Sequence, residues 1–277
     1  MHIATSFKYG IAALSVTAAG LVPTLAAAQT SQPADKWQVS ASIYAYLPSV
    51  SSSTRFPTTG GSSIDVDADT ILDSLKMAFM GSLDVHNGRW GVFNDVLYLD
   101  LGNTKTGTRD FTLGNIPLPA SVSANLDYDL KGLIWTVAGE YRLATGNPAY
   151  TIDLLAGARL FNVKTTLDYA ISGTAGSHPL AGKSGRSEVS EDLWDGIVGV
   201  KGRYAFGQNR QWYVPYYLDV GTGQSDLTWQ AAGGVGYAFG WGELSAMWRY
   251  IDYSMESGKA VESMSFNGPM FGATFRW

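Results

Sequence analysis

The chain has 277 residues, a formal net charge of −5 and no cysteine. The absence of cysteine excludes disulfides, thiolate metal ligands and a nucleophilic cysteine, and the excess of acidic residues argues against nucleic acid as a partner. Charged residues make up 16% of the chain, against roughly 25% in soluble domains, so an ordinary water-facing surface is not expected.

The first 28 residues have the layout of a secretory signal peptide. Lys8 precedes an apolar stretch from Ile11 to Leu25, which is followed by three alanines that end at Ala28. The stretch is too short and too rich in alanine and glycine for a membrane anchor, and small residues are typical of a cleavage site. We therefore expect residues 1–28 to be a signal peptide and residues 29–277 to form one domain.

Beyond this region, apolar and polar residues alternate with a period of two, which indicates β-strands, and helical periodicity is nearly absent. No later segment approaches the roughly 18 apolar residues of a membrane helix. One segment, residues 92–101, is apolar in both phases and predicts a β-bulge. The alternation predicts strands near residues 37–47, 77–86, 92–101, 133–143, 150–160, 194–206, 212–220, 227–239, 244–250 and 271–277.

The connections between these segments alternate in length, which predicts an antiparallel meander with both ends on the side of the tight turns. Ten strands fit the count, with eight and twelve as alternatives. The strands around Lys131 and Phe161 change phase, so they are expected to extend beyond the apolar band. Tight turns are expected at residues 87–89, 144–149, 207–211 and 240–241, and long, Gly-, Ser- and Thr-rich loops at residues 48–76, 103–119 and 172–191.

Such alternation fits either a soluble barrel with a dry interior or a membrane barrel with lipid outside and polar groups inside. The polar phase is mostly Ser, Thr, Gly and Ala, which is too thinly charged to coat a soluble exterior. Short turns on one side and long loops on the other are typical of outer-membrane barrels. These observations favour the membrane barrel and predict an all-β fold: a closed, antiparallel, up-and-down transmembrane β-barrel.

Aromatic residues of the apolar phase support a membrane barrel rather than a β-sandwich. One group lies beside the tight turns, and a second group lies about six to ten residues further along, a spacing that fits a lipid-facing band about 25 Å tall. Amphipathic rings are stable at both membrane interfaces. The first group includes Trp37, Tyr141, Tyr150, Tyr204, Trp212, Tyr237 and Trp277, and the second includes Trp135, Trp194, Trp229 and Tyr250.

The last strand resembles the C-terminal signal of Gram-negative outer-membrane β-barrel proteins. Trp277 is the terminal aromatic residue, Phe275 lies two residues earlier and Gly272 further back, while Met270 departs from the polar residue usual at its position. The resemblance implies recognition by the barrel assembly machinery and a location in the outer membrane, in contact with lipid and lipopolysaccharide. The chain is also similar to uncharacterised small barrels of proteobacteria, which imply no activity.

Charged residues in the inward phase are expected to form a paired network, because an unpaired charge inside the barrel would cost several kcal/mol. A network that plugs the barrel is favoured over a lining that conducts ions. About eight strands are filled by side chains and sixteen leave an open channel, so ten lies near the closed end. The expected members are Glu140, Arg142, Asp153, Arg159, Lys201, Arg203, Glu243 and Arg249.

The sequence offers little for catalysis or metal binding. The segment from Asp65 to Asp69 imitates the start of a calcium loop, but Thr70 and Lys76 stand where glycine and glutamate are needed. We expect Asp69 to cap a short helix that ends near Leu75 instead.

For catalysis, His178 with Glu188 or Glu191 is the only pairing with the residue types of an outer-rim hydrolase. We assign no catalytic residue, no metal and no cofactor. The expected protein is a monomeric, non-enzymatic outer-membrane barrel with a structural or surface-interaction role. A narrow porin-like channel for small polar solutes and a lipid- or peptide-processing enzyme are the alternatives.

Overall fold

The computed structural model describes residues 37–54, 62–107, 112–113, 116–117, 122–143, 146–175, 178–255 and 261–277. The expected signal peptide, residues 1–28, lies outside these ranges. Among the described residues, no helix is long and apolar enough to cross a membrane. In chain order the elements are β1 (Trp37–Tyr46), β2 (Ser49–Thr54), β3 (Ser62–Val66), α1 (Ala68–Asp73), β4 (Leu75–Asn87), β5 (Trp90–Gly107), β6 (Thr112–Leu113), β7 (Ile116–Pro117), β8 (Val122–Arg142), β9 (Tyr150–Ala175), β10 (His178–Phe206), β11 (Trp212–Gly223), β12 (Leu227–Ala238), β13 (Glu243–Ser254) and β14 (Val261–Arg276).

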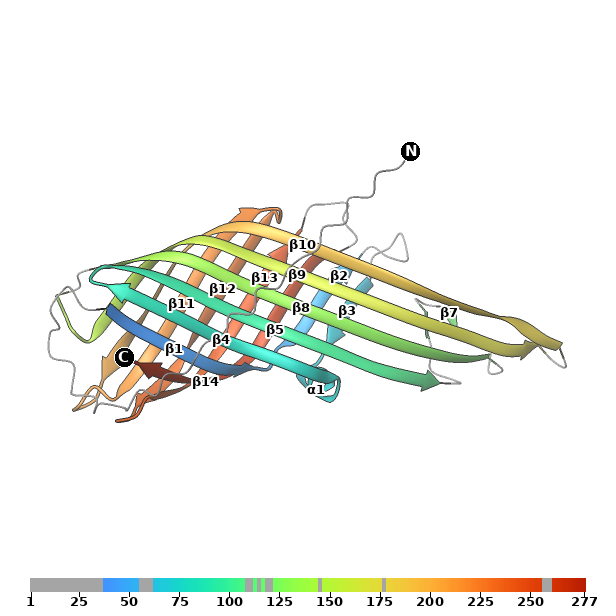
Figure 1. Ribbon diagram of the computed structural model, residues 1–277, viewed down its shortest axis with the longest axis horizontal. Coiled ribbons are helices and arrows are strands. Elements are labelled where there is room, and N and C mark those ends of the chain that lie inside the picture. Colours follow the sequence, from blue (N-terminus) through green and yellow to red (C-terminus); the bar gives the residue numbers. More distant parts are fainter. Residues whose placement is uncertain are drawn as a thin grey trace.

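The long strands form a closed antiparallel barrel (Figure 1). Neighbours along the chain pair from β4 through β5, β8, β9, β10, β11, β12 and β13 to β14. Closure comes from β1, which pairs with β4 on one side and with β14 on the other, from Ser40↔Arg276 to Tyr46↔Met270. β2 continues along β14 beyond β1, so the two act as one interrupted strand of the wall. The expected ten-stranded barrel is confirmed.

The two faces of the wall differ as the membrane interpretation requires. Large apolar side chains are exposed on the outside, among them Trp37 at 67%, Val198 at 59% and Phe271 at 53%. Charged side chains such as Glu140 and Arg159 are buried inside. The alternative of a soluble barrel with a dry core is therefore excluded, because its apolar phase would point inward.

Aromatic rings contact one another at both ends of the exterior band. Beside the tight turns, the ring centroids of Tyr150 and Tyr204 are 4.6 Å apart and those of Trp212 and Tyr237 are 5.0 Å apart. At the other end, Trp135 and Trp194 are 6.1 Å apart, as measured between ring centroids, and Trp229 and Tyr250 are 4.8 Å apart. These pairs are placed as two interfacial girdles would be.

The bulge expected in residues 92–101 is not present. β5 pairs with β8 without a register shift from Trp90 to Gly107, and the irregularity lies opposite it, between Leu75 and Met77 of β4. We call the half of the barrel beside the tight turns the inner half and the other the outer half. Both phases of β5 are apolar because its outer half lines an apolar part of the lumen. Leu97, Leu99 and Leu101 point inward and are buried there.

Four strands continue beyond the barrel as an extended sheet (Figure 1), whereas the change of phase predicts this for two of them, β8 and β9. β5, β8, β9 and β10 remain paired far past the point where β4 and β11 end. The long loop expected at residues 172–191 is therefore wrong: Ser172–Ala175 lies in β9 and His178–Glu191 in β10, paired with each other. Backbone pairing has overridden a composition typical of a loop.

The segment between β2 and β4 also differs from expectation. β3 pairs with β2 as a hairpin, and α1 follows it. The helix begins after Asp67, whose side chain makes no capping hydrogen bond, and Asp69 lies in the first turn. The expected cap at Asp69 is thus wrong by two residues, although its carboxylate still lies at the positive end of the helix.

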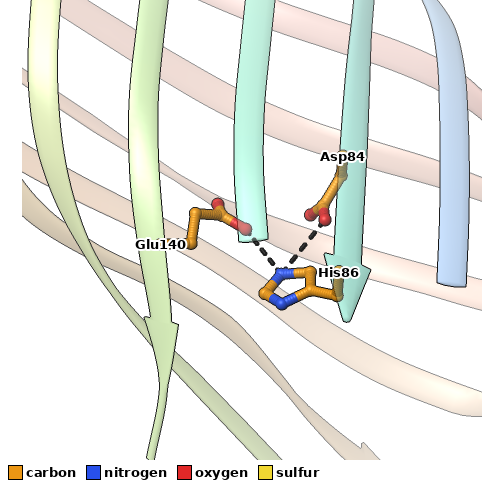
Figure 2. Close-up of side chains that lie close together, drawn as sticks. All are labelled: Asp84, His86 and Glu140. Carbon is orange, nitrogen blue, oxygen red and sulfur yellow. Dashed lines mark ion pairs between the residues drawn. The ribbon is translucent and has the colours of Figure 1, made fainter. Parts of the chain in front are cut away.

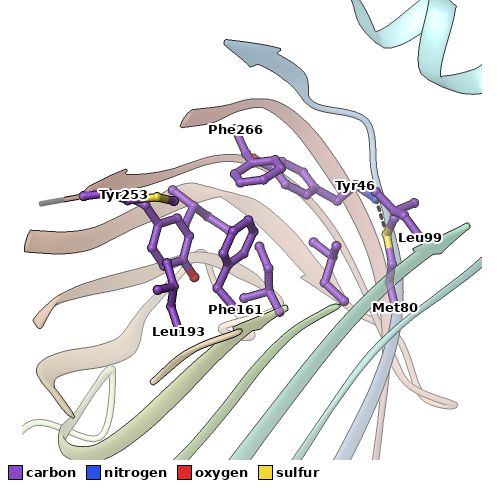
Figure 3. Close-up of a cluster of buried hydrophobic side chains, with 11 residues drawn as sticks. Tyr46, Met80, Leu99, Phe161, Leu193, Tyr253 and Phe266 are labelled. Carbon is purple, nitrogen blue, oxygen red and sulfur yellow. Dashed lines mark hydrogen bonds between the residues drawn. The ribbon is translucent and has the colours of Figure 1, made fainter. Parts of the chain in front are cut away.

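The outer half of the lumen is filled by an apolar cluster, which Figure 3 shows. Phe161 packs on Tyr253 with ring centroids 4.7 Å apart and on Phe266 at 6.1 Å. Tyr46 donates from its hydroxyl to the carbonyl oxygen of Arg249 at 3.1 Å, so its polar end is satisfied. The cluster consists of Tyr46, Met80, Leu97, Leu99, Ile134, Phe161, Leu193, Ile251, Tyr253, Met255 and Phe266.

A charge placed on the exterior at mid-height tests the lipid-facing assignment. Val198 pairs with Ala156 and Val220, between the girdle residues Trp194 and Tyr204. We expect Val198→Arg to lower the free energy of unfolding by about 2–4 kcal/mol, the range for arginine near a bilayer midplane. Denaturant unfolding in phospholipid vesicles measures this. Val198→Leu is the control and should change stability by less than about 1 kcal/mol; equal stabilities for the two variants would refute the assignment.

Candidate functional site

The inner half of the lumen contains a cluster of ionisable side chains around His86, close to the tight turn between β4 and β5. Figure 2 shows Asp84 and His86 on β4 facing Glu140 on β8. His86 Nε2 lies 2.5 Å from Glu140 Oε2, 3.1 Å from Asp84 Oδ1 and 3.8 Å from Asp153 Oδ2. His86 and Glu140 are almost fully buried, at 2% and 1% exposure.

Two cations complete the His86 cluster. Lys201 of β10 forms ion pairs with Asp84 and with Glu140 Oε1, the latter at 2.7 Å. Arg142 donates from Nε and Nη2 to the two carboxylate oxygens of Asp153, at 2.7 and 2.9 Å. Three carboxylates, those of Asp84, Glu140 and Asp153, thus face two permanent cations and one imidazole.

The short contacts of His86 and Glu140 are ion pairs. Both imidazole nitrogens and both Glu140 carboxylate oxygens are buried and have no hydrogen-bond partner in the described part of the chain. Oε2 of Glu140 faces His86 and Oε1 faces Lys201, so attraction between charges and packing hold these atoms together. Buried polar atoms left this way are uncommon and point to a role beyond packing.

Gly91 of β5 leaves room for the imidazole ring of His86. A Cβ atom at residue 91 would lie 2.6 Å from Nδ1 of His86, inside van der Waals contact. His86 and Gly91 are direct partners in the β4–β5 pairing. The missing side chain therefore creates the space in which the ring lies.

A second ion-pair group lies at the same end of the lumen. Arg203 and Arg276 both contact Glu243, at 2.7 and 2.9 Å from its two carboxylate oxygens. The Arg203 guanidinium also lies 4.7 Å from the ring centroid of Tyr213. This group joins β10, β13 and the end of β14, so it ties the last strand to the wall.

The middle of the lumen contains two arginines that are almost completely buried. Arg159, at 0% exposure, pairs with Asp219 and donates to the hydroxyl of Thr136 at 3.1 Å. Arg249 donates to Asp95 at 2.7 Å and to the Gln230 side-chain oxygen at 3.0 Å. The first pair joins β9 to β11, with β10 between them, and the second joins β13 to β5 across the lumen.

Another buried acid, Asp195, is satisfied without a cation. It accepts bonds from the Ser225 backbone N–H at 2.9 Å and the Ser225 hydroxyl at 2.7 Å. Ser225 belongs to the turn between β11 and β12, so this buried carboxylate holds an outer turn against the rim.

The structure brings all eight expected network residues into the lumen, in several groups rather than one. Glu140, Arg142, Asp153 and Lys201 belong to the His86 cluster, Arg203 and Glu243 to the group with Arg276, and Arg159 and Arg249 to separate pairs. The expected assembly-signal residues Gly272, Phe275 and Trp277 lie in or directly after β14. Phe275 and Trp277 are exposed on the wall.

The histidine considered for catalysis lies elsewhere. His178 begins β10 in the extended sheet, and its side chain is outside the part that the structure describes. Glu188 forms an ion pair with Lys164 at 2.6 Å, and Glu191 pairs through its backbone with Val163. The Lys164 ammonium lowers the pKa of the Glu188 carboxyl, which keeps it ionised and poorly suited to act as a general acid.

Sequence reasoning missed the partners that make these groups. Asp84, His86, Asp95 and Asp219 all lie in the inward phase of their strands and are buried or half-buried. Their inward phase is the signal that could have identified them. The phase does not give the height of each residue in the barrel, which depends on strand stagger.

The fold and the lumen together define a class. A closed antiparallel wall exposes no sheet edge to lipid. Together with an apolar exterior, aromatic girdles and a charged interior, it is the architecture of outer-membrane β-barrels. The chain is a protein of this class.

Comparison with known proteins gives distant structural similarity only. No protein-family model matches the sequence, and no curated protein matches it. The outer-membrane protease OmpT from Escherichia coli is similar at 10% identity and a TM-score of 0.46, over 90% of this chain and 99% of that chain. The attachment invasion locus protein Ail of Yersinia pestis, in complex with the heparin analogue sucrose octasulfate, is similar at 10% identity and a TM-score of 0.35, over 87% and 99% of the two chains. The translocator domain of the autotransporter NalP from Neisseria meningitidis is similar at 13% identity and a TM-score of 0.36, over 89% and 90%.

The buried pair of Arg159 and Asp219 gives a test of the lumen network. We expect Arg159→Ala to destabilise the barrel by about 3–5 kcal/mol, because it leaves Asp219 buried without its cation. Adding Asp219→Ala should recover part of that loss, with a coupling of about 0.5–3 kcal/mol. Denaturant unfolding in vesicles gives the double-mutant cycle.

An exposed ion pair provides the matched control for this cycle. Lys164→Ala, in the pair with Glu188, should cost less than about 1 kcal/mol. Strictly additive effects of the Arg159 and Asp219 substitutions would contradict the buried pair.

Proposed function

We propose that the protein is a non-enzymatic, monomeric outer-membrane barrel whose lumen is closed and whose extended sheet acts as an interaction surface outside the cell. The observation that carries the proposal is the filling of the lumen at successive heights. Ion pairs occupy the inner half, two buried arginines the middle, and the apolar cluster the outer half.

The energetics of these groups oppose conduction. An ion that moved through the lumen would have to separate Arg159 from Asp219 and Arg249 from Asp95, and each separation would leave a charge buried without its partner. It would then have to pass Phe161, Tyr253 and Phe266, whose rings are in contact. A ten-stranded barrel lies near the size at which side chains fill the interior.

The extended sheet supports the surface role. Its strands stay paired beyond the girdle, and charges on neighbouring strands face one another, as in Lys164 with Glu188 and Arg186 with Asp168 at 3.9 Å. Among the described residues, the part of β10 that precedes Trp194 pairs with β9 alone. A paired sheet with charged side chains of this kind is a platform for contacts at the cell surface.

Two further contacts belong to the proposal. The apolar exterior lies against outer-membrane lipid, and the base of the extended sheet lies among lipopolysaccharide head groups. The C-terminal strand, with Phe275 and Trp277 exposed, is the segment offered to the barrel assembly machinery during insertion.

Single-channel recording in planar bilayers tests the closed lumen. We expect the wild-type barrel to insert without stable conductance steps. A triple variant, Phe161→Ala, Tyr253→Ala and Phe266→Ala, should show steps, because it removes the rings that fill the outer half of the lumen.

The triple variant also controls for insertion. If it shows conductance steps, the barrel inserts under these conditions, and a silent wild type is then closed rather than absent from the bilayer. Defined steps from the wild type that disappear when Arg159 or Arg203 is neutralised would instead identify a conducting channel and overturn the closed lumen.

Cysteine labelling on intact cells tests the surface role, and the chain has no native cysteine to interfere. Ser190, exposed in the extended sheet, and Gln208, exposed in a tight turn, are suitable sites. We expect a membrane-impermeant maleimide to label Ser190→Cys on intact cells. Gln208→Cys should react only after the outer membrane is permeabilised, and the reverse pattern would place the extended sheet in the periplasm.

A further inference from the structure

The His86 cluster contains the donor atoms of a metal site. One nitrogen and two carboxylate oxygens, from His86, Asp84 and Glu140, lie within 4.8 Å of one another. Asp153 is held by Arg142, whereas Asp84 and Glu140 share the single ammonium of Lys201. One cation therefore serves two carboxylates at the place where the three donor atoms meet.

We propose that Asp84, His86 and Glu140 form a binding site for a divalent transition-metal ion, with Zn²⁺ as the ion of best fit, at the periplasmic mouth of the lumen. His86 supplies Nε2, and Asp84 and Glu140 supply one carboxylate oxygen each. The site is additional to the closed-barrel role and does not depend on it.

The donor set fits zinc better than calcium or magnesium. Zn²⁺ takes imidazole nitrogen and carboxylate oxygen at about 2.0–2.2 Å, commonly with three protein ligands and one open position, whereas Ca²⁺ and Mg²⁺ prefer oxygen alone. Two ligands of a tetrahedral ion with such bonds lie about 3.3 Å apart. The Nε2 atom of His86 is 3.1 Å from Asp84 Oδ1 and 2.5 Å from Glu140 Oε2, so the first distance fits and the second needs a small opening.

The buried atoms of the site also point to a ligand. Nε2 of His86 and both carboxylate oxygens of Glu140 lack a hydrogen-bond partner among the described residues, although both side chains are more than nine-tenths buried. A metal ion between them would satisfy the nitrogen and one oxygen at once. Arg142 holds Asp153 by two bonds beside the ring, which leaves Asp153 as an outer carboxylate rather than a ligand.

Lys201 is the competitor of the metal. Its ammonium lies on Asp84 and Glu140, where it takes the place of a cation, and 4.2 Å from the ring centroid of Phe93. Binding of Zn²⁺ must move this ammonium away. The side chain of Asp84 is 23% exposed and that of Arg142 30%, so the cluster is open toward the mouth of the lumen and an ion can reach it.

Metal titration of the purified, tag-free barrel in detergent tests the site. We expect one Zn²⁺ per barrel by competition with a chromophoric chelator, and Co²⁺ to give the visible absorption of a nitrogen- and oxygen-ligated ion. His86→Ala should weaken binding by about 100-fold or more, since it removes a ligand. His178→Ala, which removes a histidine of the extended sheet, should leave binding unchanged. The affinity for Zn²⁺ should fall as the pH is lowered, because protons compete for Nε2.

Two further variants separate a metal site from a purely structural ion-pair cluster. Lys201→Met should tighten Zn²⁺ binding about tenfold or more by removing the competing charge, whereas a structural cluster would only lose stability. Gly91→Ala should weaken binding by displacing the imidazole. Heat-modified electrophoretic mobility confirms that each variant is folded. Absence of one-to-one binding by the wild type, or equal binding by folded His86→Ala, would overturn the proposal.

Discussion

Closure of the wall is the constraint on which the rest of the structure depends. In lipid no water is available to the backbone, so every N–H and C=O group must pair within the protein, and unpaired groups cost several kcal/mol each. Pairing of β1 with β14, from Ser40↔Arg276 to Tyr46↔Met270, removes the two edges that an open sheet would expose. Closure also encloses one face of every strand in a narrow space. That enclosed face then has to be satisfied by side chains alone.

The lumen satisfies this demand in two ways that follow its access to water. Near the tight turns, Arg142 and Lys201 keep part of their hydration, and their ion pairs involve partly exposed groups. Deeper in the barrel, Arg159 has no exposure and is held by Asp219 and two threonine hydroxyls. Further out, charges give way to the cluster around Phe161 and Tyr253, where burial of rings needs no ionic partner.

The sequence predicts the wall better than its contents. Period-two alternation identifies the strand faces, and tight turns give the number of strands, because both depend on local residue type. The alternation correctly places Glu140 and Arg159 in the lumen. It does not show that Arg159 contacts Asp219 of β11, sixty residues away along the chain. That contact depends on strand stagger, which no local pattern records. Strand β5 shows a similar limit. Leu97 and Leu99 predict a bulge because the local pattern does not show that part of the lumen is apolar.

The two ends of the ionic lumen differ in access to water rather than in the count of charges. At mid-height, Arg159 with Asp219 and Arg249 with Asp95 are buried ion pairs, and the buried carboxylate of Asp195 is held by two neutral donors from Ser225. At the mouth, the side chain of Asp84 is 23% exposed, so a cation from solution can reach the carboxylates beside His86. An ion that displaces Lys201 from Asp84 and Glu140 therefore releases the ammonium where water is near. Displacement of Arg159 from Asp219 would instead leave both charges buried, at a cost of several kcal/mol.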